Sequence, residues 1–108
     1  MIVEITDANF DSILLDTSKP IVLDFWAPRC GPCRMISPYF DELAEEFKTE
    51  LVVGKVNVDT NSNLAMRFGV RSIPTILYLK EGIVVDKQVG ATTKKVLVDK
   101  VNQKLFDN

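Results

Sequence analysis

The 108-residue sequence contains no histidine, only two cysteines and a single tryptophan. It has no apolar run that approaches the ~20 residues needed to cross a membrane, and no cluster of lysines and arginines that would attract nucleic acid. The first seven residues lack a basic segment followed by an apolar core, so they do not form a secretory signal. We therefore expect a cytoplasmic protein that binds neither nucleic acid nor membrane.

The composition that remains is ordinary for a globular protein. The chain is 46% hydrophobic and 26% charged, with a formal net charge of −2. No internal repeat, low-complexity stretch or linker interrupts it, and its length is enough to bury a core without metal or crosslinks. We expect a single domain over residues 1–108, and a monomer.

The two cysteines lie close together as Cys30-Gly31-Pro32-Cys33, directly after an apolar run. A structural zinc site needs four nitrogen or sulfur ligands, so without histidine or a second cysteine pair a metal would have to be shared between chains. A purely structural disulfide gains little from so short a loop, because the stabilisation grows with loop length. The spacing favours a pair that cycles between dithiol and disulfide, with no metal.

The hydrophobic pattern predicts alternating strands and helices. Strands are expected over 2–6, 21–26, 51–58, 75–80 and 83–89, and helices over 7–15, from the cysteines to about 47, over 63–68 and from about 93. Thr6 or Asp7 is available to cap the first helix, and Glu81-Gly82 fits a tight hairpin. This order predicts an α/β fold with a mixed sheet of about five strands and about four helices on both faces.

The cysteines fall where a strand ends and a helix begins. Unpaired N–H groups in the first turn of a helix carry partial positive charge, which stabilises a thiolate. We therefore expect the pKa of Cys30 to be lowered and Cys30 to be the nucleophile. Arg29 and Arg34 flank the pair and act in the same direction. Cys33, one turn into the helix, should be less exposed and should face Cys30.

The two residues between the cysteines suit this position. Gly31 lets another chain approach closely, and Pro32 is tolerated in the first turn because its missing N–H would have no partner there. In thiol exchange, the Cys30 thiolate would attack a target disulfide, and Cys33 would then attack the mixed disulfide that results. Cys33 must lose a proton in a partly buried place, so a nearby base would help.

Asp24 is the candidate base. It is the only charged residue in the run 21–26, where a buried carboxylate is costly unless it has a partner or a role. Lys55, placed similarly in the run 51–58, could be that partner if the two strands are neighbours. Alternatively, Asp24 and Lys55 point outward or only neutralise each other.

The segment 24–35, Asp-Phe-Trp-Ala-Pro-Arg-Cys-Gly-Pro-Cys-Arg-Met, resembles the active-site signature of the thioredoxin family. The resemblance continues along essentially the whole chain, through Pro38, Lys55, Asp59, the segment 71–75 (Arg-Ser-Ile-Pro-Thr), Gly82 and the segment 89–91 (Val-Gly-Ala). It implies the thioredoxin fold and a protein-disulfide reductase. Cys30 would be nucleophilic, Cys33 resolving, and Asp24 and Lys55 would assist proton transfer.

The resemblance also implies partners. No bound cofactor is expected, because electrons come from NADPH through a separate thioredoxin reductase. Expected target proteins are of the ribonucleotide reductase, methionine sulfoxide reductase and peroxiredoxin types. A cis peptide before Pro74 would expose the backbone of Ile73 to an extended target segment. The docking surface implied by the family comprises Trp26, Gly31, Pro32, Ile73, Pro74, Val89, Gly90 and Ala91.

One residue departs from the family pattern. Thioredoxins usually carry tryptophan before the first cysteine, and this chain has Arg29. The exchange replaces an aromatic contact with a cation, which predicts a more acidic Cys30 and a preference for acidic partner surfaces. Pro28 is a lesser departure.

Two other functions remain open at this point. The first is a different thiol oxidoreductase, glutaredoxin-like or oxidising, although Gly-Pro between the cysteines resembles the reducing thioredoxins. The second is a binding or scaffold module in which the thiols are incidental. Retained function after both cysteines are replaced by serine would favour the binding module.

Overall fold

The computed structural model describes residues 1–106, and it contains one five-stranded mixed sheet. The strands lie in the order β1 (Ile2–Glu4), β3 (Val52–Asn57), β2 (Ile21–Trp26), β4 (Thr75–Lys80) and β5 (Ile83–Val89). The pairs β1–β3 and β3–β2 are parallel, whereas β2–β4 and β4–β5 are antiparallel. The predicted α/β class with a mixed sheet is confirmed.

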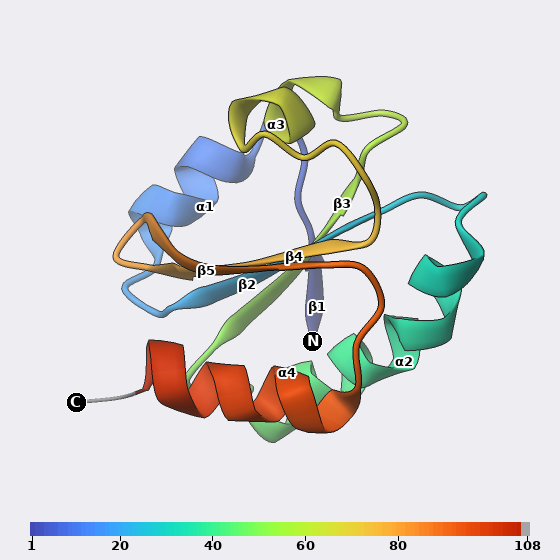
Figure 1. Ribbon diagram of the computed structural model, residues 1–108. Helices are drawn as coiled ribbons and strands as arrows, with labels where there is room; N and C mark the ends of the chain where they lie inside the picture. Colours follow the sequence, from blue (N-terminus) through green and yellow to red (C-terminus); the bar gives the residue numbers. More distant parts are fainter. Residues whose placement is uncertain (107–108) are drawn as a thin grey trace.

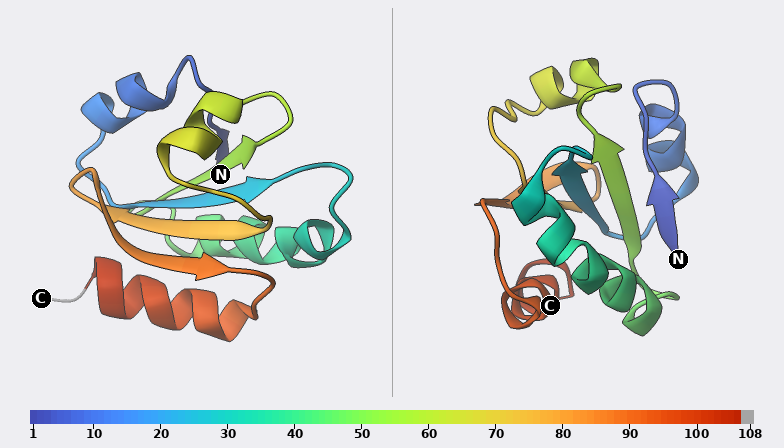
Figure 2. Two further views of the ribbon diagram at one scale, coloured as in Figure 1. Left: turned by 45° about the horizontal axis from the view of Figure 1, so that its top comes forward. Right: turned by 90° about the vertical axis from the view of Figure 1, so that its right-hand side faces the viewer.

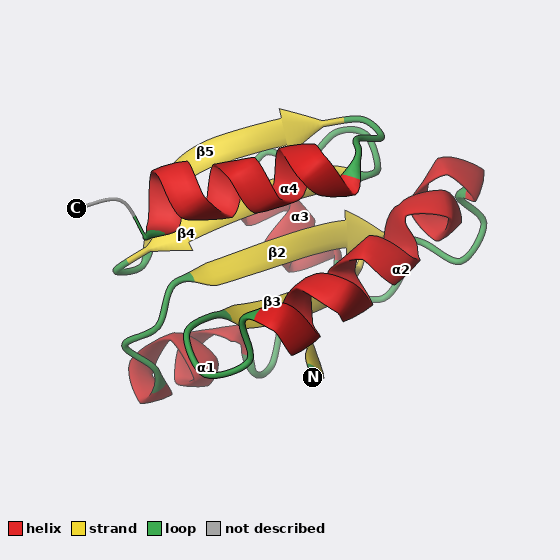
Figure 3. Ribbon diagram, turned by 90° about the horizontal axis from the view of Figure 1, so that it is seen from below, coloured by secondary structure: helices red, strands yellow, loops and turns green. Residues whose placement is uncertain are grey.

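Helices cover both faces of this sheet. In Figure 1, α1 (Phe10–Asp16) and α3 (Ser62–Arg67) lie above the strands, while α2 (Gly31–Glu46) and α4 (Lys94–Lys100) lie below them. Figure 3 shows α2 and α4 crossing the lower face side by side, and the two views of Figure 2 show the same layers. The helix α4 continues as a π-helical turn, Val101–Leu105. None of the helices in residues 1–106 is long and apolar enough to span a membrane.

The alternating pattern of the strands sorts the core into two layers. Val22 and Tyr78 pack with Phe40 of α2 and Leu97 of α4 on one face. Leu23 and its neighbours pack on the other face, against α1 and α3. Because side chains of a strand alternate between faces, Asp24 lies on the same face as Val22, the face that α2 and α4 cover.

The first helix begins later than the sequence pattern predicts. Its first residue is Phe10, because Thr6 and Asn9 form a turn in which each backbone N–H donates to the other's side chain. Asp7 does not cap this helix. Its carboxylate instead accepts hydrogen bonds from the N–H groups of Asn63 and Leu64 at the start of α3, so it anchors a helix that is distant in sequence.

Gly54 permits close packing between β3 and the layer above it. A methyl group at this position would lie 2.6 Å from Cδ1 of Ile5 and 3.3 Å from Cδ2 of Leu23, both fully buried. At the hairpin between β4 and β5, Glu81 and Gly82 both have positive φ, as a tight two-residue hairpin turn requires.

Candidate active site

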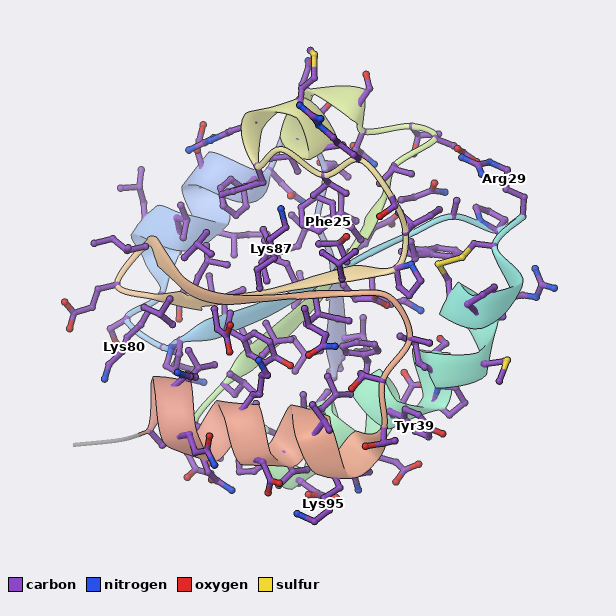
Figure 4. All side chains as sticks on the ribbon, in the orientation of Figure 1. Phe25, Arg29, Tyr39, Lys80, Lys87 and Lys95 are labelled. Carbon is purple, nitrogen blue, oxygen red and sulfur yellow. A yellow bond between two sulfur atoms is a disulfide. The ribbon has the colours of Figure 1, made fainter. Side chains whose placement is uncertain are left out.

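The strand directions bring the predicted site residues to one end of the molecule. Because β2 runs parallel to β3 and antiparallel to β4, the carboxyl ends of β2 and β3 meet the amino end of β4 there, beside the carboxyl end of β5. The helix α2 starts after a short loop at the end of β2, and Figure 4 shows the sulfur–sulfur bond beside this helix start.

Cys30 and Cys33 form a disulfide whose Cα atoms are 5.2 Å apart. Cys30 is the N-cap of α2, and its Sγ accepts a hydrogen bond from the backbone N–H of Cys33 at 3.2 Å. The sulfur of Cys30 therefore lies at the positive end of a 16-residue helix dipole, as the sequence predicts. Cys30 keeps 9% of its surface exposed and Cys33 keeps 1%, so Cys30 is the more accessible of the two.

Asp24 is completely buried, on the sheet face that α2 covers. Within the described chain neither of its carboxylate oxygens has a hydrogen-bond partner. Burial raises its pKa from 3.8 to about 7, and the positive charge of Lys55 offsets only part of that rise. A carboxyl with such a pKa exchanges its proton near neutral pH, which is the property that a base for a buried thiol needs.

Lys55 is the direct neighbour of Asp24 in the ladder between β2 and β3, so the two strands are neighbours as the prediction required. It does not form an ion pair with Asp24 among the described contacts. Its ammonium donates instead to Oγ of Ser37 at 2.7 Å and lies 4.8 Å from the centre of the Trp26 ring. Asp24 and Lys55 therefore make no direct hydrogen bond, although the charge of Lys55 still acts on Asp24.

Ser37 is not among the site residues predicted from the sequence, although its spacing from Cys33 indicates that it lies near the site. It follows Cys33 by four residues, and side chains four residues apart share one face of a helix. The hydrogen bond from Lys55 fixes a positive charge between β3 and α2. Pro38, the next residue, lies inside α2 without ending it.

The arginines beside the disulfide have partners that the sequence does not reveal. Nη2 of Arg29 lies 3.1 Å from Oδ1 of Asp59, in the loop after β3. Nη1 of Arg34 donates to the backbone oxygen of Pro28 at 2.7 Å. The carboxylate of Asp59 offsets the charge of Arg29, so Arg29 does not present the free cation that the sequence suggests.

The predicted docking residues surround the disulfide on three segments. The peptide bond between Ile73 and Pro74 is cis, as the resemblance implies. The backbone N–H of Gly90 donates to the oxygen of Pro74 at 2.8 Å, which ties the end of β5 to this loop. Pro32, Val89 and Ala91 are exposed, Trp26, Gly31, Ile73 and Gly90 are half-buried, and Pro74 is buried.

Comparisons with known proteins agree with this geometry. The family model named Thioredoxin matches residues 1–103. A thioredoxin from Haemophilus influenzae is 51% identical over 102 residues, which cover 94% of this chain and 95% of that protein. A thioredoxin from Chlorobaculum thiosulfatiphilum is 44% identical over 100 residues, 93% of each chain. A chloroplastic M-type thioredoxin from Pisum sativum is 42% identical over 99 residues, which cover 92% of this chain and 58% of the pea protein.

Proposed function

Since this chain belongs to the thioredoxin family and is a protein-disulfide reductase, we propose that Cys30 and Cys33 carry the exchange in two separate roles. The observation that carries the proposal is the difference between the two sulfurs. One caps the start of α2 and is partly exposed, and the other lies one turn inside and is buried.

In the first step, the reduced Cys30 thiolate attacks one sulfur of a target disulfide. The target S–S bond breaks, a mixed disulfide forms between Cys30 and the target, and the released target thiolate takes a proton from water. The start of α2 stabilises the thiolate before attack, because its unpaired N–H groups face Cys30. Gly31, Pro32 and Arg34 lie in the first turn of this helix.

In the second step, Cys33 loses its proton and attacks the Cys30 sulfur of the mixed disulfide. The bond to the target breaks, the second target thiolate takes a proton, and the Cys30–Cys33 disulfide forms. Asp24 is the base that we propose for Cys33, with Lys55 as the neighbouring charge. The support is the location of Asp24 on the sheet face that the Cys33 helix covers, together with a pKa of about 7.

Target polypeptides dock, in this proposal, on the surface formed by Trp26, Gly31, Pro32, Ile73, Pro74, Val89, Gly90 and Ala91. In the part of the chain that the structure describes, the backbone N–H and oxygen of Ile73 have no hydrogen-bond partner. An extended target segment can therefore pair with this backbone as an added strand does.

A separate reductase restores the dithiol by passing two electrons from NADPH, so the chain itself needs no bound cofactor. The targets are proteins that cycle through disulfides, of the ribonucleotide reductase, methionine sulfoxide reductase and peroxiredoxin types. We place this activity in the cytoplasm, where thiols are kept reduced.

The experiment that tests the two roles is trapping of the mixed disulfide. The Cys33→Ser variant, reduced and mixed with oxidised insulin, should accumulate a covalent adduct through Cys30, because the second step is blocked. Mass spectrometry of the adduct identifies the linked residue.

The matched variant is Cys30→Ser, which keeps one thiol in the same loop. It should form less than about one tenth as much adduct, because the remaining thiol is buried and lacks the N-cap position. Equal trapping by both variants would contradict the assignment of roles, and no adduct with either would contradict the exchange mechanism itself.

A further inference from the structure

A groove of about 260 Å³ lies between α3 and the loop that precedes β4. Two arginines, Arg29 and Arg71, line it together with the apolar side chains of Val58, Ala65, Val70 and Ile73. Arg29 is adjacent in sequence to Cys30, and Ile73 is adjacent to the cis Pro74. A target segment that pairs with Ile73 and presents a sulfur to Cys30 therefore passes the mouth of this groove. Figure 4 shows Arg29 at the same end of the molecule as the sulfur–sulfur bond.

The two arginines differ in how their charges are balanced. Arg29 is held by Asp59 at 3.1 Å. Arg71 is exposed, and within residues 1–106 no carboxylate or other hydrogen-bond acceptor contacts its guanidinium. The groove thus presents one uncompensated guanidinium, although the chain as a whole has a net charge of −2. A guanidinium binds a carboxylate through two parallel hydrogen bonds, a geometry that a neutral or basic side chain cannot offer.

The α3 side of the groove is held in place by hydrogen bonds from other segments. The carboxylate of Asp7 accepts from the N–H groups of Leu64 at 2.9 Å and Asn63 at 3.3 Å, which secures the start of α3. Asn61 accepts from the N–H of Asp7 at 2.9 Å and donates to the oxygen of Asn57 at 3.0 Å. A groove held in this way loses little conformational freedom when it is occupied, which favours binding.

We propose that this groove is a specificity site for an acidic side chain of the target, close in sequence to the target's reactive cysteine. Arg71 binds the carboxylate, Arg29 lines the same groove in the position set by Asp59, and the apolar residues contact the methylenes of a glutamate. The inference rests on the proposed function and adds a substrate preference to it.

The test uses short peptides whose single cysteine is capped as a mixed disulfide with 2-mercaptoethanol, which is neutral. Glutamate, glutamine or lysine is placed two residues before or two residues after the cysteine. The full chain is reduced beforehand and freed of reductant, so no reductase is involved, and the second-order rate of peptide release is measured by chromatography.

The wild-type protein should reduce the glutamate peptide about fivefold faster than the glutamine peptide in at least one of the two positions, which is the upper end of what an exposed ion pair contributes. This preference should fall towards unity in 1 M salt. Arg71→Gln should abolish it, and Arg71→Glu should reverse it in favour of the lysine peptide.

The matched control is Lys48→Gln, which removes the same charge just after the far end of α2 and should keep the fivefold preference. Equal rates on the glutamine peptide for wild type and variants show that the exchange chemistry is intact. Reduction of all peptides without a charge preference, or a preference that survives in Arg71→Gln, overturns this inference alone. Failure to reduce any peptide overturns the proposed function as well.

Discussion

Because Asp24 is buried, the stability of the protein should depend on pH. Its pKa is about 7 in the folded protein and 3.8 when the side chain is exposed. Between these two pH values the unfolded chain loses a proton that the folded chain retains, so folding becomes less favourable as the pH rises. The difference of about three pKa units corresponds to about 4 kcal/mol at pH 8, at 1.36 kcal/mol per unit.

Replacing Asp24 with asparagine removes this ionisation and keeps the shape of the side chain. The buried amide still lacks partners for its N–H groups, which costs about 1–2 kcal/mol. We therefore expect Asp24→Asn to be about 2–3 kcal/mol more stable than wild type at pH 8. At pH 4 most of the advantage disappears, and the variant should be slightly less stable. The two stability curves should cross between these values.

The assay is chemical denaturation of the oxidised protein in urea from pH 4 to pH 8, with the free energy of unfolding obtained by linear extrapolation. Groups that the substitution does not affect contribute equally to both proteins, so their contributions cancel in the difference between the two free energies of unfolding. Of the other groups on this face, Tyr78 stays neutral because burial, and to a lesser extent Asp86, raise its pKa.

Asp86 supplies a control of opposite sign. Burial raises its pKa, but the hydrogen bond from Lys100, the N–H of Lys87 and the charges of Lys100 and Lys104 together lower it below 3.8. Its contribution to stability is therefore present above pH 3.8 and is lost as the pH falls, so Asp86→Asn should lose stability at pH 8. If the difference between Asp24→Asn and wild type does not vary from pH 4 to pH 8, Asp24 is ionised in the folded protein and the reasoning is wrong.

Two further predictions follow from single contacts. Gly54→Ala should lower the free energy of unfolding by about 1–3 kcal/mol in the same urea assay, because the new methyl group overlaps the buried Ile5. Gly31→Ala is the control, because its methyl group meets no atom within 4 Å and should not lower the free energy of unfolding. A loss for Gly54→Ala as small as that for Gly31→Ala would show that Ile5 moves aside. Asp59→Asn should lower the pKa of the reduced Cys30, because it frees the charge of Arg29, and Arg29→Trp should raise that pKa. The pH dependence of Cys30 alkylation measures both shifts. If the two variants shift the pKa in the same direction, electrostatics is not the cause.

Much of the fold is predictable from local sequence because periodicity reports which faces are buried. The run Ile21–Trp26 is apolar apart from Asp24, and it forms the central strand β2 with the predicted bounds. The strands Thr75–Lys80 and Ile83–Val89 also have their predicted bounds, since Glu81-Gly82 adopts the positive φ angles of a tight turn. The last helix begins after Thr93, whose side chain accepts from the N–H of Val96.

Contacts between distant segments are not visible in such patterns. Asp7 looks like a cap for the helix that follows it, but it caps α3, which is more than 50 residues away. The charge on Arg29 looks free, because nothing near it in sequence indicates that Asp59 approaches within 3.1 Å. The tertiary fold determines which partner each of these side chains meets. The residues could therefore be identified from the sequence, but their partners and electrostatic effects could not.

The position of Lys55 shows why such a distinction matters for the chemistry. An ammonium bonded directly to Asp24 would stabilise the carboxylate and lower its pKa, and the side chain would then be charged at neutral pH and a poor base. Instead Ser37 and the Trp26 ring hold the ammonium, so its charge acts on Asp24 without a hydrogen bond. Burial consequently remains the larger effect, and the pKa stays near 7. A proton can then move on to Asp24 and off again near neutral pH.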